Sequence, residues 1–89
     1  MGKTLSQAEV EQLYADNAAH EARLAALTNI DVADVIALHR HVRFFVASEL
    51  WARLTQAGRT ALLNDGHPHV RSAAEISHRG DVPVSVAVL

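Results

Sequence analysis

The pentapeptide His-x-His-Val-Arg occurs twice in this chain of 89 residues, at positions 39–43 and 67–71. The two copies are offset by 28 positions, a spacing that fits a repeat of two short helices. Two interpretations are open at this point. Either the shared residues build similar helix pairs, or the paired histidines bind a metal ion. The first predicts a scaffold and the second predicts a site.

The composition limits the chain to one small domain over residues 1–89. Apolar residues make up 49% of the chain but aromatic residues only 4%, which is typical of closely packed helices. The absence of cysteine excludes disulfides, thiolate metal sites and a cysteine nucleophile. No apolar run approaches the roughly 20 residues of a membrane span, and we expect a cytoplasmic protein without a membrane partner. The net charge of −2 gives no general attraction to nucleic acid.

The first predicted helix covers residues 6–27. Ser6 and Glu9 form the S-x-x-E pattern of a capping box, which marks a helix start. Apolar residues then follow at three- and four-residue spacing, at Val10, Leu13, Leu24 and Leu27. This pattern predicts an amphipathic helix of a hairpin, and a self-associating coiled coil is the alternative.

A second helix is predicted over residues 32–57, followed by a short helix over 59–64 and another over 68–78. The second helix would be about 39 Å long at 1.5 Å per residue, which is long for so small a domain. We therefore expect a break near Ser48 or Gly58. Pro68 suits the first position of the last helix, where its missing N–H costs nothing.

Residues 82–89 form a tail in which every second residue is valine: Val82, Val84, Val86 and Val88. Alternation of this kind predicts a short β-strand or an extended tail. The chain contains no second strand pattern to pair with it. We therefore expect the tail either to add to a sheet of another chain or to remain disordered.

The second pentapeptide lies in a segment that resembles the centre of a HEAT-type or variant leucine-rich repeat. In these families a short helix ends in Leu-Leu-x-Asp, a tight turn contains Pro, and the next helix opens Val-Arg-x-Ala-Ala. The matching residues are Asp65, Pro68, Val70, Arg71, Ala73 and Ala74. The resemblance covers about residues 36–79. In the first copy Val42 and Arg43 match, but Ala37 and Arg40 stand where the Asp and the Pro would be.

Three contacts are expected around the second copy. Asp65 can cap the free N–H groups of the following helix, Arg71 can reach back to the turn carboxylate, and Val70 points into the seam between helices. The resemblance implies a helical scaffold that binds other proteins, sometimes nucleic acid, and implies no enzyme activity. The predicted fold is all-α: a helical hairpin plus a HEAT-like helix pair, with a C-terminal strand or tail.

Metal binding is the alternative function, through His39, His41, His67 and His69. Residues two apart on a helix point about 200° away from each other, so the first pair cannot chelate one ion unless the helix is broken between them. We therefore favour no metal and no cofactor. A pH switch through the clustered imidazoles is a further possibility.

Nucleic-acid binding is the second alternative, through Arg40, Arg43, Arg59 and Arg71. The balancing acidic residues and the near absence of lysine argue against it. No segment has a catalytic pattern, so we expect no enzyme. The sequence thus predicts a non-catalytic protein–protein interaction or self-assembly module, either a small adaptor or a homo-oligomeric subunit.

Overall fold

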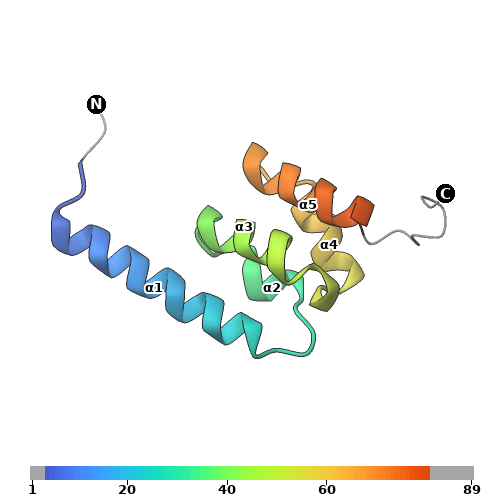
Figure 1. Cartoon of the computed structure of the whole chain (residues 1–89), viewed down its shortest axis with the longest axis horizontal. Helices are drawn as coiled ribbons and strands as arrows, with labels where there is room; N and C mark the ends of the chain where they lie inside the picture. Colours follow the sequence, from blue (N-terminus) through green and yellow to red (C-terminus); the bar gives the residue numbers. More distant parts are fainter. Residues whose placement is uncertain (1–3, 81–89) are drawn as a thin grey trace.

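The computed structural model describes residues 4–80, and this part of the chain is all-α, as predicted (Figure 1). Its elements are α1 (Gln7–Ala25), α2 (Val32–Val35), α3 (Arg40–Glu49), the 3-10 helix η1 (Trp51–Arg53), α4 (Gln56–Leu63) and α5 (Pro68–Gly80). The strand predicted at residues 82–89, with its four valines, lies outside the described residues. No helix within residues 4–80 is long and apolar enough to cross a membrane.

Side chains that cap backbone N–H groups explain most helix starts. Ser6 and Glu9 form the predicted capping box of α1, with the Ser6 N–H donating to Glu9 Oε1 at 2.8 Å. Asp31 caps α2 in the same way. Thr55 Oγ1 accepts from the Gly58 N–H at the start of α4, and Pro68 is the first residue of α5. The side chains of Ser6, Asp31 and Thr55 thus accept hydrogen bonds from N–H groups that have no partner inside their own helices.

The helix predicted over residues 32–57 is divided twice, once near Ser48 as expected and once at an unexpected position. It stops after α2, and His39 adopts an extended backbone (ψ 146°) before α3 begins. It stops again at Leu50 and passes through η1 to an extended Leu54 (ψ 140°). The breaks therefore lie at residues 36–39, where none was expected, and at 50–55, close to Ser48. The helix predicted over 59–64 begins earlier, because α4 starts at Gln56, before Gly58.

An isolated parallel bridge between Ile30 and Leu54 explains the second break. The Ile30 N–H donates to the Arg53 carbonyl at 2.8 Å, and the Thr55 N–H donates to the Ile30 carbonyl at 2.9 Å. These bonds hold Leu54 extended, so the helix cannot continue through it. Gly58 packs directly against this bridge, because a Cβ atom built on it would lie 2.9 Å from Leu54 Cδ2 and 3.1 Å from the Ile30 carbonyl oxygen.

The core lies where α3, α4 and α5 pack together, with the end of α1 against α3 (Figure 1). Its buried apolar residues are Leu24, Ile30, Val35, Val42, Val46, Ala47, Leu50, Trp51, Leu54, Leu62, Val70, Ala73 and Ala74. The Ser77 hydroxyl donates to the Ala47 carbonyl at 2.6 Å and links α5 to α3. The close approach of these helices follows from the alanines at their interface.

Trp51 closes one end of the core and is only 5% exposed. The Arg59 guanidinium lies 5.5 Å from the centroid of its ring, within the range of a cation–π contact. The His78 ring approaches edge-on, with centroids 6.1 Å apart. Trp51 therefore joins η1, α4 and α5.

Candidate interaction groove

Each copy of His-x-His-Val-Arg begins a helix in the same way. His39 precedes α3, and its Nδ1 accepts the His41 N–H at 3.0 Å. His67 precedes α5, and its Nδ1 accepts the His69 N–H at 3.2 Å. An imidazole nitrogen accepts a hydrogen bond only when it carries no proton. The first histidine of each copy is therefore a capping residue in its neutral form.

The valine and arginine of each copy also have matching positions. Val42 and Val70 are fully buried between the helices. Arg43 Nη1 donates to the Leu38 carbonyl, and Arg71 Nη1 donates to the Asp65 carbonyl at 2.7 Å. In both cases the arginine bonds the chain just before its own helix.

Asp65 makes neither of its two predicted contacts in the expected form. Its Oδ1 accepts the His67 N–H at 2.9 Å, one residue before α5 begins. Its carboxylate pairs with Arg43 of α3, at 2.7 Å to Nε and 3.1 Å to Nη2. Arg71, the partner expected from the sequence, bonds the Asp65 main chain instead. Burial of the Asp65 carboxyl opposes its ionisation, but the hydrogen bonds and the charge of Arg43 outweigh this, so its pKa lies below the ordinary value.

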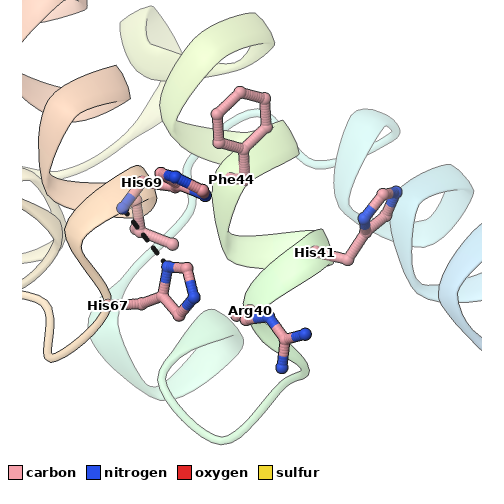
Figure 2. Close-up of a pocket in the computed structure, with 6 residues that line it drawn as sticks. Arg40, His41, Phe44, His67 and His69 are labelled. Carbon is pink, nitrogen blue, oxygen red and sulfur yellow. Dashed lines mark hydrogen bonds between the residues drawn. The ribbon is translucent and has the colours of Figure 1, made fainter.

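The two histidine pairs do not converge on a common point. Figure 2 shows His41 pointing toward α1, on the other side of Phe44 from His67 and His69. His39 and His67 already use Nδ1 for capping. Nowhere in residues 4–80 do three histidine, aspartate or glutamate side chains come together as metal ligands.

The four arginines considered for nucleic-acid binding contact different parts of the chain. Arg43 and Arg71 bond the Asp65 turn. Arg59 Nε donates to the Trp51 carbonyl at 3.3 Å. Arg40 lines a pocket together with His41, His67 and His69 (Figure 2). The charges of the four arginines therefore do not form one continuous surface for a phosphate backbone.

What the fold does create is a groove along the outer side of α3 and α5, which run in the same direction (Figure 1). Two adjoining pockets, of about 240 and 300 Å³, share Phe44 and His69. One lies at the helix starts and is lined by Arg40, His41, Phe44, His67, His69 and Val70. The other continues toward the helix ends and is lined by Phe44, Ser48, His69, Ser72, Ala73, Ile76 and Ser77. We call the two together the α3–α5 groove.

The groove has a charged end and an apolar end. Phe44 and Ile76 are 45% and 62% exposed, and together they form the apolar end of the groove. Arg40 lies at the charged end, and no carboxylate is among the residues that line either pocket. Burial and the positive charges of Arg40 and His69 lower the pKa of His67, although Asp65 opposes them. Arg40 and the positive dipole ends of α3 and α5 give the charged end a positive potential, which favours an anion.

The sequence interpretation identified one half of this site and missed the other. His41, His67, His69 and Val70 were singled out as motif residues, and all four line the groove. Phe44 and Ile76 were not. Phe44 differs from its neighbour Phe45, which packs against the core, and only the orientation of α3 decides which of the two is exposed.

No protein-family model, curated protein or solved structure matches this chain. The resemblance of residues 36–79 to HEAT-type repeats therefore stays a prediction.

Proposed function

We propose that this protein is a non-catalytic, cytoplasmic interaction module that binds an acidic, amphipathic protein segment in the α3–α5 groove. The observation that carries the proposal is the joining of an apolar pocket to a positively charged pocket along one pair of helices. A scaffold related to HEAT-type repeats, as the sequence resemblance implies, would use exposed side chains of this kind.

The chemistry of the groove favours a helical partner. A partner helix presents apolar side chains at positions i, i+3 or i+4, and i+7, and these can cover Phe44 and Ile76. Ser48, Ser72 and Ser77 line the same pocket. Ser48 and Ser72 are exposed, so their hydroxyl oxygens can accept hydrogen bonds from polar groups of the partner, whereas the Ser77 hydroxyl is already bonded to Ala47.

The charged pocket determines the sign of the charge that a partner segment must carry. Carboxylates near Arg40 would find a cationic side chain and the positive ends of two helix dipoles, those of α3 and α5. Attraction between unlike charges increases the association rate of the two molecules. This attraction becomes weaker at high salt concentration, because ions screen the charges. We therefore expect salt-sensitive binding of acidic segments and exclusion of basic ones.

Selection from a random peptide library tests this function, because such a library offers acidic, basic and apolar segments alike. The expected peptides carry Asp or Glu together with apolar residues at helical spacing. Ile76→Glu should weaken their binding about tenfold or more, since it places a charge in the apolar pocket. Ile36→Glu is the matched control, because Ile36 is 47% exposed and lines neither pocket. Enrichment of basic peptides, or equal binding by both variants, would contradict the proposal.

A further inference from the structure

The first half of α1 projects from the body of the molecule (Figure 1). None of residues 5–16 is buried, whereas Asn17 and Leu24 anchor the second half. Tyr14 is 64% exposed and Leu5 is 45% exposed. Residues 5–16 are therefore helical from Gln7 onward and carry apolar side chains that no other part of residues 4–80 covers.

This segment carries the charge that the groove lacks. Glu11 and Asp16 lie on it, Glu9 is part of its cap, and no Lys or Arg occurs between residues 4 and 22. The groove in turn carries Arg40 and no carboxylate. The two surfaces are complementary in charge, and each has exposed apolar residues.

The lengths of the two surfaces are also similar. The 13 residues of α5 extend over about 20 Å. The helical residues 7–16 extend over about 15 Å at the same rise per residue. In one molecule the two cannot meet, because Asn17 and Leu24 hold α1 against α3 with its first half directed away from the groove (Figure 1).

We propose that the α3–α5 groove binds the first half of α1 from a second copy of this chain. This inference rests on the proposed function and names the acidic segment as part of the protein itself. If the α1 of each copy binds in the groove of the other copy, the two copies form a symmetric dimer in which both grooves are occupied. Covering Phe44, Ile76 and Tyr14 would remove three exposed large apolar side chains of each copy from water.

Mixing two complementary variants tests the contact. Tyr14→Lys disables the donated helix and leaves the groove intact, and Ile76→Glu disables the groove and leaves the helix intact. Both side chains are more than 60% exposed, so neither change disturbs the core. Sedimentation of the whole chain from about 1 μM to about 1 mM should show a dimer for the wild type. Each variant alone should dissociate about tenfold or more readily, and an equimolar mixture should form a one-to-one dimer through the remaining intact contact.

A charge exchange gives an independent readout. Arg40→Glu should weaken the dimer, and Glu11→Lys with Asp16→Lys in the same chain should restore it. Ile36→Glu should leave the dimer unchanged. A mixture of Tyr14→Lys and Ile76→Glu that remains monomeric would overturn the inference, as would loss of the dimer in Ile36→Glu.

The peptide selection separates this inference from the proposed function. A wild-type protein that stays monomeric but binds selected acidic peptides in the groove overturns the second copy as the occupant and keeps the function. A monomer for which no groove-dependent peptide is found overturns both.

Discussion

Asp65 connects three parts of the chain through a single carboxylate. It receives the His67 N–H before α5 and the Arg43 guanidinium from α3, and its side chain is 2% exposed against 18% for Arg43. Asp65→Asn would leave the guanidinium without its counter-charge. We expect the free energy of unfolding to fall by about 3 kcal/mol, measured by urea unfolding followed by circular dichroism.

Glu75→Gln is the control for this change, because Glu75 is exposed on α5. It should alter the free energy of unfolding by less than about 0.5 kcal/mol. Equal stability of the Asp65 and Glu75 variants would show that the ion pair does not hold the turn.

The two capping histidines make stability depend on pH. Partial burial and the positive charges of Arg40, His41 and Arg43 lower the pKa of His39, and burial with Arg40 and His69 lowers that of His67. As pH falls below about 6.5, the unfolded chain therefore takes up protons more readily than the folded one, and stability decreases. Urea unfolding should show a less stable protein at about pH 5.5 than at about pH 7.5.

Replacing both histidines by asparagine tests the origin of this effect. Asparagine caps helices without titrating. The His39→Asn, His67→Asn double variant should lose much of the difference between the two pH values. The lowered pKa of Asp65 places the loss of its ion pair at more acidic pH, outside this window. A double variant with the full pH dependence of the wild type would exclude the caps as its source.

At the scale of elements, Gly58 shows how packing reverses a helix propensity. Alanine normally stabilises a helix relative to glycine by about 1 kcal/mol. Here a Cβ atom would lie 2.9 Å from Leu54 Cδ2 and 3.1 Å from the Ile30 carbonyl oxygen. We expect Gly58→Ala to lower the free energy of unfolding by about 1–3 kcal/mol, which is measured as a lower melting temperature.

Gly66→Ala is the matched control, because nothing lies within 4 Å of the added Cβ and no glycine within residues 4–80 has a positive φ. It should leave the melting temperature unchanged or raise it. If both variants melt alike, the bridge between Ile30 and Leu54 does not constrain α4.

The same bridge shows which elements can be predicted from the sequence. The starts of α1 and α5 were predicted because Ser6, Glu9 and Pro68 act on neighbouring backbone. The break after Leu50 has no proline or glycine to mark it. It depends on hydrogen bonds from Ile30, more than 20 residues away in the chain. The break before α3 rests on His39, an uncommon capping residue, and on Arg43 reaching back to Leu38.

At the scale of the whole molecule, the groove could be predicted only in part. The repeated pentapeptide indicated two similar helix starts, and these starts do lie beside each other. The buried faces of α3 and α5 pack into one core, and this packing places the two helices side by side. It also leaves Phe44 and Ile76 on the outer side. No periodicity within one helix contains that information.

The projecting α1 predicts an uneven distribution of local stability. Residues 11–16 have no buried side chain, whereas α3 and α5 each contribute three buried residues to the core. In dilute protein, amide hydrogens of residues 11–16 should exchange about tenfold or more faster than those in the middle of α3 and α5. Mass spectrometry of the exchanged peptides measures this. Uniform protection would mean that α1 is held along its whole length.

The burial of Trp51 gives this protein an optical signal of its own. It is the single tryptophan of the chain, and its indole lies between Arg59 and His78 at the junction of η1, α4 and α5. Its fluorescence therefore reports on the packing of that junction. Unfolding should shift the emission to longer wavelength as water reaches the ring. Ligands of the α3–α5 groove, whose lining does not include Trp51, should leave the emission unchanged.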